Sequence, residues 1–332
     1  MTALQKQSLK ALVAGLKKYD RFLLTCHVIP EGDAIGSMLA MESLLRRMGK
    51  KTSVVCQDEF PERLSCLSSK KWVRTRDLGA RRPAFDAVVL TDSPNLDRIG
   101  DVGSLLTPKT AIFNIDHHVS NTRFGTYNYI RPEAAATAEV VFDIFRALKM
   151  PLKRDEAKNL YVALVTDTGS FKYSNTTAYS HEMASHLIAA GIDIEQINDE
   201  IHGTYSLKTM KLYSRLLARV RTTENGTIGW VGMRREDLKA SGATHEDAEG
   251  FIDFLRYIKP VRIAFFMSEV GSGGKDHAIR VSFRAKGPYD VNKIATYFNG
   301  GGHKKASGCM IRASLEEAER RIVEKIRKEL RI

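Results

Sequence analysis

The sequence has few cysteines and no long apolar run, and these absences exclude several classes of protein. Its 332 residues include four cysteines and no CxxC pair, so neither a zinc-ribbon site nor a disulfide framework is expected. No apolar run approaches the roughly 20 residues needed to span a bilayer. The amphipathic first 20 residues also lack the apolar core of a signal peptide. We therefore expect a cytoplasmic protein without membrane association.

A basic tail is also missing, although the chain as a whole is basic. Its formal net charge of +12 is spread over both halves of the sequence. A positive charge of this size favours anionic partners such as nucleotides or nucleic acid, while its dispersion argues against a binder of long DNA. The length is sufficient for two domains, because a single core rarely grows beyond ~250–300 residues.

The first part of the chain alternates short apolar segments with helical periodicity. Strands are predicted at 21–26, 52–56, 86–91 and 111–115, and helices at 34–48, 134–148, 155–165 and 177–190. Continuous apolar strands separated by helices indicate a parallel sheet covered on both faces.

A second alternation follows a helix predicted over 207–221. Its strands are predicted at 227–233, 261–270, 278–284 and 310–312, and its helices at 246–258, 291–297 and 315–330. We therefore predict an α/β fold in two domains. A parallel-sheet domain covers residues 1–190, a helical connector 191–225, and a smaller mixed-sheet α/β domain 226–332.

Acids and histidines follow the predicted strands of the first domain. These residues are His27, Glu31, Asp33, Asp92, Asp116, His117 and His118, with Asp167 after a predicted helix. The carboxyl ends of strands in an open α/β sheet lie together, so these side chains are expected in one crevice. Each acid alone has an ordinary explanation, such as a helix cap for Asp33 or a turn for Asp92 and Asp167.

Their coincidence at successive strand ends favours a metal site. Five carboxylates in one crevice would repel each other strongly, and two divalent cations would relieve that repulsion. Carboxylate and imidazole ligands without thiolates suit manganese, iron or cobalt. Two metals that share a carboxylate are an arrangement suited to attack on phosphorus.

The order of these residues resembles the four-motif signature of the DHH phosphoesterases. His27-x-x-x-Glu31-x-Asp33, Asp92, Asp116-His117-His118 and Asp167 follow the motifs, and the GGGHKKASG run at 300–308 resembles the GGGH motif of the DHHA1 domain. The resemblance covers almost the whole chain. The size of the chain is similar to that of the NrnA-type subgroup, which are bifunctional oligoribonucleases and 3′-phosphoadenosine 5′-phosphate (pAp) phosphatases. Glu31 departs from the family, which usually has aspartate there.

The resemblance implies two divalent metal ions, with manganese favoured and magnesium or cobalt as alternatives. The implied metal ligands are His27, Glu31, Asp33, Asp92, His117 and Asp167, with Asp92 bridging the two ions. Asp116 would accept the ring N–H of a ligand histidine, and His118 would face the substrate. Asp92, Asp116 and His118 are therefore the expected catalytic residues.

The second domain is expected to bind the substrate phosphate in a cleft between the domains. The implied contacts are Arg284, Gly301, Gly302, His303 and Ser307, with Arg262 as a further candidate. The three glycines are expected to form an anion-binding nest, although a glycine-rich turn is the alternative. Phe171, Tyr173 and Asn175 are candidates for contacts to the base or ribose, with core packing as the alternative for Phe171.

These expectations describe a metal-dependent phosphoesterase that hydrolyses short oligoribonucleotides, and pAp to AMP and phosphate. The alternatives are a RecJ-like single-strand exonuclease, a family II pyrophosphatase, a linear or cyclic dinucleotide phosphodiesterase, and a non-catalytic nucleotide- or RNA-binding module. A homodimer is left open. Metal-dependent turnover separates the enzymes from the binding module, and substrate length separates the enzymes from each other.

Overall fold

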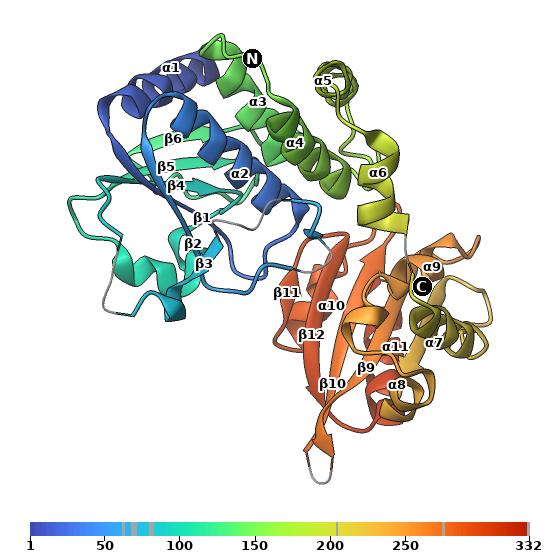
Figure 1. Cartoon of the computed structure of the whole chain (residues 1–332). Coiled ribbons are helices and arrows are strands. Elements are labelled where there is room, and N and C mark those ends of the chain that lie inside the picture. Colours follow the sequence, from blue (N-terminus) through green and yellow to red (C-terminus); the bar gives the residue numbers. More distant parts are fainter. Residues whose placement is uncertain (62–63, 68–71, 80–82, 204, 274–275, 331–332) are drawn as a thin grey trace. The chain divides into compact units, whose positions relative to one another are not determined.

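The computed structural model describes residues 1–61, 64–67, 72–79, 83–203, 205–273 and 276–330. The chain divides into two compact units, Met1–Thr204 and Tyr205–Ile332 (Figure 1). The division falls inside the connector that we predicted over 191–225. The earlier part of that segment lies in unit 1 as α6 (Ile194–Asn198) and η4 (Asp199–Gly203), and the later part contains α7 (Leu207–Leu217) of unit 2.

Unit 1 alternates strands and helices, where η marks short 3₁₀ or π segments. Its strands are β1 (Arg21–Cys26), β2 (Lys51–Cys56), β3 (Trp72–Arg74), β4 (Ala87–Thr91), β5 (Ala111–Asp116) and β6 (Tyr127–Ile130). Its other elements are α1 (Ala3–Lys18), α2 (Gly32–Arg47), η2 (Thr75–Asp77), η3 (Leu96–Leu105), α3 (Thr137–Ala147), α4 (Arg154–Asp167) and α5 (Ala178–Ala189), besides α6 and η4.

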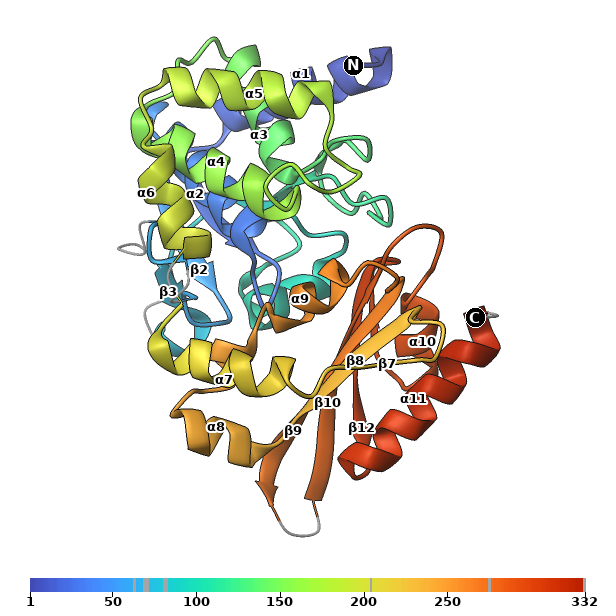
Figure 2. The same ribbon diagram turned by 90° about the vertical axis from the view of Figure 1, so that its right-hand side faces the viewer.

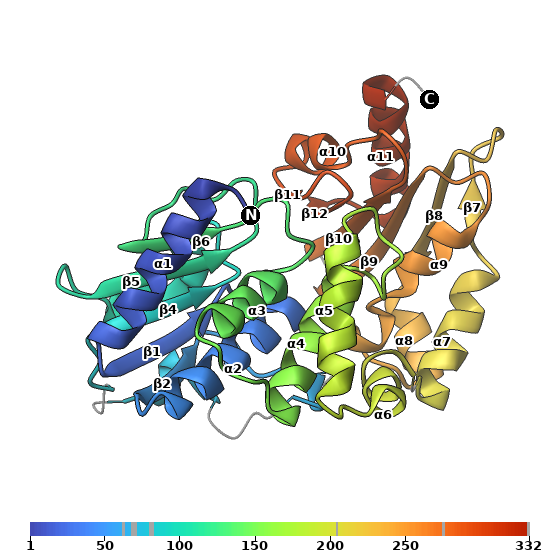
Figure 3. The same ribbon diagram turned by 90° about the horizontal axis from the view of Figure 1, so that it is seen from above.

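The strands of unit 1 form one sheet in the order β3-β2-β1-β4-β5-β6, counted over the described residues (Figure 1), and Figure 3 shows β2, β1, β4, β5 and β6 of this sheet from above. All neighbouring strands run parallel, which confirms the predicted parallel sheet. The chain builds one half of the sheet outward from β1 and then returns to build the other half outward from β4. The carboxyl ends of β1 and β4 therefore form the topological switch point, where open α/β sheets place their ligands.

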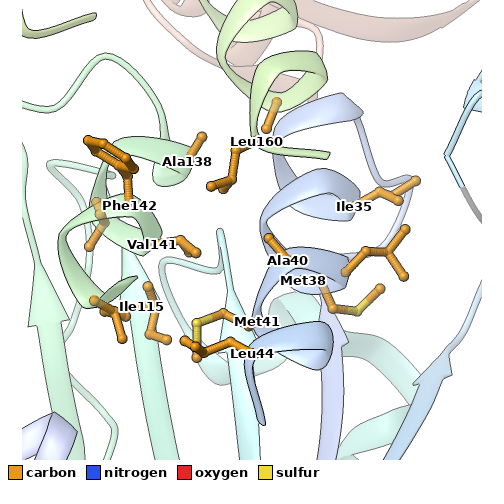
Figure 4. Packing of buried hydrophobic residues seen from close by; sticks show 14 of the residues in the cluster. Ile35, Met38, Ala40, Met41, Leu44, Ile115, Ala138, Val141, Phe142 and Leu160 are labelled. Atoms are coloured by element: carbon orange, nitrogen blue, oxygen red, sulfur yellow. The ribbon is translucent and has the colours of Figure 1, made fainter. Parts of the chain in front are cut away.

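Both faces of this sheet are buried, which explains the apolar strand sequences. The five residues of β4 are all buried, and they divide by strand alternation between two cores. Ala87 and Val89 pack with the helices α1 to α5, whereas Val88 and Leu90 pack with η3. Figure 4 shows side chains of α2 and α3, among them Met41 and Val141, filling the space above the sheet.

Two strands of unit 1 were not predicted. The segment β6 has only four residues, and its half-buried Tyr127 and Asn128 obscure the apolar signal. The segment β3 has three residues, none of them buried. Both pair at the edges of the sheet, where hydrogen bonding to an existing strand creates order that the local sequence does not encode.

Helices α2 and α4 approach each other closely at two glycines. A Cβ atom on Gly36 would lie 2.2 Å from the Asn159 carbonyl oxygen, and one on Gly32 would lie 2.5 Å from the Thr166 hydroxyl. These glycines are one helical turn apart, so they lie on the same face of α2. Only hydrogen at these positions lets the beginning of α2 lie against the end of α4. Those two helix ends carry Asp33 and Asp167.

Gly36→Ala is expected to lower the free energy of unfolding by ~1–3 kcal/mol, because the new methyl overpacks a backbone contact. In an exposed helix the same change would stabilise by about 1 kcal/mol, so the sign of the effect is diagnostic. Gly103→Ala is the control, since nothing lies within 4 Å of its added Cβ. Denaturant unfolding measures both variants, and a stabilised Gly36→Ala protein would contradict the close approach.

Unit 2 contains a mixed sheet, as predicted. Its strands are β7 (Arg221–Thr222), β8 (Ile228–Met233), β9 (Ile263–Gly273), β10 (Asp276–Ala285), β11 (Gly301–Gly302) and β12 (Ala306–Arg312). Its helical segments are α7, α8 (Arg235–Ser241), η5 (Glu246–Ala248), α9 (Phe251–Tyr257), α10 (Asn292–Tyr297) and α11 (Leu315–Leu330). The order is β11-β12-β10-β9-β8-β7, and only the β8–β9 pair is parallel within the described part of this sheet.

Helices cover the two faces of this second sheet. Helices α10 and α11 pack on one face, with Val281 and Phe283 of β10 in the shared core, and α7 and α9 pack on the other against Ala264 and Phe266 of β9 (Figure 2). The single helix predicted over 246–258 is wrong. It divides into η5 and α9 because Gly250 adopts a left-handed conformation, with φ of +89°, at the start of α9.

Candidate metal centre

The polar side chains predicted for the site follow the strands that meet at the switch point. His27 directly follows β1, Asp92 directly follows β4, and Asp116 ends β5 with His117 and His118 next in sequence. Because β1, β4 and β5 are consecutive neighbours in the sheet, their carboxyl ends bring these residues together. The sheet topology thus assembles the centre from segments almost 100 residues apart.

The ring of His117 lies among three carboxylates from three different elements. Its Nε2 is 3.6 Å from Asp92 Oδ1, 3.6 Å from Asp167 Oδ2 and 3.9 Å from Asp33 Oδ2. Its Nδ1 lies 3.1 Å from the Ala134 carbonyl oxygen. Since a carbonyl only accepts, Nδ1 carries a proton, and Nε2 is the nitrogen that faces the carboxylates and can bind a metal ion when it is deprotonated.

Asp33 lies in the first turn of α2, not in the loop before it as we predicted. The helix begins two residues earlier than expected because Glu31 has the extended conformation of an N-cap. The Asp33 carboxylate accepts hydrogen bonds from the backbone N–H of Thr137 at 2.6 Å and of Ala138 at 3.0 Å. The N-terminus of α3 therefore holds this buried carboxylate, where unpaired N–H groups and the helix dipole favour negative charge.

Asp92 occupies a strained backbone position at the centre of the group. Its φ is +59°, which is uncommon for any residue except glycine and is tolerated best by aspartate and asparagine. One carboxylate oxygen accepts the Thr137 hydroxyl hydrogen at 2.9 Å, and the other lies 3.4 Å from His27 Nε2. The conformation turns the carboxylate toward His27 on one side and His117 on the other.

Asp116 positions its neighbours. Its fully buried carboxylate accepts hydrogen bonds from the His117 backbone N–H at 2.8 Å, from His118 Nδ1 at 2.7 Å and from Asn121 Nδ2 at 2.6 Å. The ring that Asp116 holds is therefore that of His118, the residue expected to face the substrate, and not that of an expected ligand. His118 Nδ1 also lies 3.5 Å from Asp92 Oδ1.

Asp167 is the last residue of α4, where we predicted a loop. Its side chain is 32% exposed, so it forms the solvent edge of the group. Asn175 donates to the carbonyl oxygens of Asp167 and Ala135 at 3.1 and 2.9 Å, so its amide group holds the backbone at the end of α4 in place.

The two aromatic candidates for contacts to the base or ribose differ in their surroundings. Phe171 stacks on His181 with ring centroids 4.9 Å apart, and Tyr173 is exposed.

Two overlapping groups of these residues could hold a metal ion. The first consists of Asp92, His117 and His118, and the second of Asp33, His117 and Asp167. His27 lies beside the first group through Asp92. Glu31 is exposed and belongs to neither group among the described residues, although its charge contributes to the raised pKa of Asp167. The donors are oxygen and imidazole nitrogen, which suit a hard or borderline divalent ion.

The pKa values show that this cluster of charges is unbalanced without a cation. Burial, together with the charges of Asp92 and Asp167, raises the pKa of Asp33 well above its ordinary value. Burial likewise raises the pKa of Asp167 to about 6. Burial lowers the pKa of His117, but the charges of Asp92, Asp33 and Asp167 outweigh it and raise this pKa to about 9. A protonated His117 thus substitutes for missing positive charge.

Metal binding is expected to release protons. At pH 7 the metal-free His117 carries a proton, whereas a metal ligand must present a neutral imidazole. Raising the pH toward 9 removes that competing proton, so affinity should rise by up to about tenfold per pH unit for each proton displaced. Calorimetric titration with Mn²⁺ at pH 6, 7 and 8, in buffers of different ionisation enthalpy, measures both effects. A pH-independent affinity without proton release would contradict this charge arrangement.

The candidate phosphate contacts of unit 2 differ in their local structure from the prediction. Gly301 and Gly302 form the short strand β11, which pairs with β12, so the predicted glycine nest is wrong. The Ser307 hydroxyl donates to the Val291 carbonyl at 2.9 Å and is buried. Arg284 lies on β10, half-buried, and Arg262 is exposed just before β9. His303 continues from β11, and its backbone N–H donates to the Ala306 carbonyl at 2.7 Å.

Sequence reasoning missed three residues that support the centre. Thr137 connects two carboxylates, Asn121 holds Asp116, and Arg98 Nη2 lies 3.3 Å from His27 Nδ1. Asn121 follows the Asp-His-His triplet closely enough to have been suspected. Thr137 and Arg98 gave no signal, because their partners lie more than 40 residues away in sequence.

The described helices include none that is both long and apolar enough to cross a membrane. This agrees with the absence of long apolar runs in the sequence.

Both units of the chain are similar to known protein families. Residues 21–164 match the model of the DHH family N-terminal domain, and residues 234–331 match the DHHA1 domain. The bifunctional oligoribonuclease and PAP phosphatase NrnA of Thermus thermophilus is 28% identical over 308 residues, which are 92% of this chain and 89% of that protein. The protein of the same name from Bacillus subtilis is 28% identical over 312 residues, 93% of this chain and 95% of that protein.

One solved structure is also similar to this chain over almost its whole length. The crystal structure of an exopolyphosphatase-related protein from Bacteroides fragilis has a TM-score of 0.90 and 25% sequence identity, and the match covers 98% of each chain.

Proposed function

We propose that this chain is a metal-dependent phosphoesterase of short oligoribonucleotides and pAp. The premise is that it belongs to the DHH family and carries a DHHA1 domain. The observation that supports this most strongly is the position of His117, whose Nε2 lies within 3.9 Å of three carboxylates. Such a concentration of acid around one imidazole suits the binding of divalent metal ions by a hydrolase. Relatives similar over 92% and 93% of this chain are named for both activities.

In this proposal two divalent ions, preferably Mn²⁺ and alternatively Mg²⁺ or Co²⁺, bind among the side chains of these two overlapping groups and His27. His27, Asp33, Asp92, His117 and Asp167 would hold them, with Asp92 shared and Glu31 reaching the edge of the site. Divalent ions bound there supply Lewis acidity toward a phosphoryl oxygen and neutralise the carboxylates. We place the activity in the cytoplasm.

The side chains around the ligands have their own roles. Asp116 holds His118 Nδ1 at 2.7 Å, so the ring presents Nε2 as its other nitrogen. Burial lowers the pKa of His118, but its hydrogen bond to Asp116 and the charge of Asp92 raise it above the ordinary value. A proton held there suits His118 for donating to a phosphate oxygen or to the leaving group.

Unit 2 supplies the contacts to a substrate phosphate. Arg284 and His303 are the main candidates, with the backbone of Gly301 and Gly302 and the Arg262 side chain beside them. The Ser307 hydroxyl hydrogen is engaged with Val291, so in this proposal Ser307 contributes through packing. A contact to a terminal phosphate would favour short substrates.

Catalytic efficiency is expected to be highest on pAp and on oligoribonucleotides of roughly two to five nucleotides, and to fall steeply with length. A short ligand contacts few phosphates and releases few counterions, so salt should weaken binding only modestly. The test compares Mn²⁺-loaded protein on pAp, an RNA series from a dinucleotide to a 24-mer, and pyrophosphate, at two salt concentrations.

Each contrary result points to a different activity. Processive degradation of the 24-mer with a steep salt dependence would indicate a single-strand exonuclease. Turnover of pyrophosphate alone would indicate a pyrophosphatase, and tight nucleotide binding without turnover would indicate a binding module.

A further inference from the structure

Two histidines of the metal centre direct their Nδ1 atoms at backbone carbonyl groups. Nδ1 of His117 lies 3.1 Å from the carbonyl oxygen of Ala134. Nδ1 of His27 lies 2.8 Å from the carbonyl oxygen of Val28. Because a carbonyl only accepts hydrogen bonds, each Nδ1 carries a proton. The Nε2 atoms of both rings face Asp92 instead, at 3.6 and 3.4 Å, so these are the nitrogens available to a metal ion.

The peptide group that accepts the His117 proton is itself hydrogen-bonded to a buried carboxylate. The Ala134 carbonyl and the Ala135 N–H belong to one peptide group, and this N–H donates to Glu139 Oε2 at 3.2 Å. Glu139 is 1% exposed, and its other oxygen accepts the Ser180 hydroxyl hydrogen at 2.6 Å. Burial raises the pKa of Glu139, whereas the hydrogen bonds from Ser180 and Ala135 favour the ionised form and oppose that rise. His117 and Glu139 are thus connected through a single peptide group.

His27 has the same arrangement in another part of unit 1. Its acceptor, the Val28 carbonyl, shares a peptide group with Ile29, whose N–H donates to Asp58 Oδ2 at 2.6 Å. Ile29 has a φ of +55°, which is a strained conformation for a β-branched residue. Such strain persists only where surrounding contacts impose it, and it is concentrated at functional sites. Asp58 follows β2 whereas Glu139 lies in α3, so two separate segments provide the same connection.

Ordinary helix capping does not explain the contact of Glu139. Glu139 is the third residue of α3, and a glutamate at that position typically accepts the N–H of the N-cap residue. The N-cap residue is Ala136, whereas Glu139 accepts the N–H of Ala135, one residue earlier. The carboxylate therefore contacts the one peptide group whose carbonyl faces His117.

We propose that Glu139 and Asp58 are positioning residues, which make their two histidines better ligands for divalent metal ions through the intervening peptide groups. This inference rests on the metal binding in the proposed function. A carboxylate that accepts the peptide N–H polarises the peptide group, so its carbonyl becomes a stronger acceptor for Nδ1–H. A stronger hydrogen bond at Nδ1 fixes the orientation of the ring and makes Nε2 a more basic ligand.

The variants Glu139→Gln and Asp58→Asn test this proposal, because each removes a charge but keeps an oxygen that can accept the peptide N–H. In calorimetric titration at pH 8, each variant should bind Mn²⁺ roughly three- to tenfold more weakly than the wild type. This loss is smaller than the ~10–100-fold expected when a ligand histidine loses its direct hydrogen-bond partner, because the carbonyl itself remains.

Each variant has a matched control. Glu156 is also buried and also accepts a serine hydroxyl and a backbone N–H, those of Ser43 and Lys153. It lies in the first turn of α4, at the end of that helix far from the metal centre. Glu156→Gln should therefore leave the Mn²⁺ affinity unchanged. Glu59→Gln removes the exposed charge next to Asp58 and should also leave it unchanged.

Nuclear magnetic resonance of metal-free protein labelled with ¹⁵N-histidine measures the connection without a metal ion. A stronger hydrogen bond moves the resonance of its proton downfield. Glu139→Gln should therefore move the Nδ1–H resonance of His117 upfield and leave that of His27 in place. Asp58→Asn should move the His27 resonance and leave that of His117 in place, and this variant tests the proposal even if Glu139→Gln does not fold.

Normal Mn²⁺ affinity in both of these variants would overturn the proposal. An equal loss of affinity in the two controls, or Nδ1–H resonances that do not respond to their own carboxylates, would overturn it as well. Failure of the proposed function looks different, because the wild type would then bind Mn²⁺ and show both resonance shifts on substitution but would hydrolyse neither pAp nor short RNA.

Discussion

Replacing Asp92 with asparagine is expected to lower phosphoester hydrolysis by at least ~10³-fold, because the substitution removes the charge shared by the proposed metal sites. Asparagine is the matched replacement for two reasons. It tolerates the left-handed backbone conformation of this position, and its side-chain oxygen can still accept the Thr137 hydroxyl hydrogen, which lies 2.9 Å from Asp92 Oδ1 in the wild type. The fold should therefore persist.

Asp97→Asn is the control for this variant. Asp97 is an exposed acid of η3, so its loss should leave turnover within about twofold of the wild type. Initial rates on pAp and on a dinucleotide measure activity, and circular dichroism with thermal melting checks folding. A folded Asp92→Asn protein with wild-type rates would exclude Asp92 from the chemistry.

Removal of metal is expected to have an effect of similar size. Chelator should abolish turnover, and added Mn²⁺ should restore it. Metal should also stabilise the fold, because Asp33, Asp92 and Asp167 converge on one histidine and repel each other when no cation is bound. A ligand at ~100 times its Kd adds ~2.7 kcal/mol to the free energy of unfolding.

Thermal unfolding with and without Mn²⁺ measures this stabilisation. The Mn²⁺-dependent rise in Tm should disappear in His117→Ala and persist in His186→Ala, which removes an exposed histidine of α5. Undiminished turnover in chelator, or the same Tm rise in both variants, would contradict a metal centre at His117.

The sequence predicted the parts of this molecule that depend on short-range patterns. Apolar strands followed by acids or histidines predicted the parallel sheet and the convergence of His27, Asp92 and His117, whereas the strand order that creates the switch point was not predicted. Those inferences succeed because the carboxyl ends of parallel strands meet wherever the strands pair, whatever the details of the loops.

Other features depend on contacts that no local pattern encodes. Asp33 is bound by the N-terminus of α3, more than 100 residues later in the chain, so its place inside a helix and its hydrogen-bond partners could not be inferred. The glycines at 301 and 302 suggested an anion-binding nest, but they form the strand β11 because they pair with the edge of β12. The strand β6 likewise exists because β5 provides its partner.

Two metal ions are proposed to bind around His117, and electron paramagnetic resonance of Mn²⁺-titrated protein tests this most directly. The spectrum should reach two bound Mn²⁺ per chain and show spin coupling, because ions that share a carboxylate lie only ~3.5–4 Å apart. Asp92→Asn should lose the coupling. A single uncoupled Mn²⁺ at saturation, in a wild type that hydrolyses pAp at full rate, would contradict the two-metal centre.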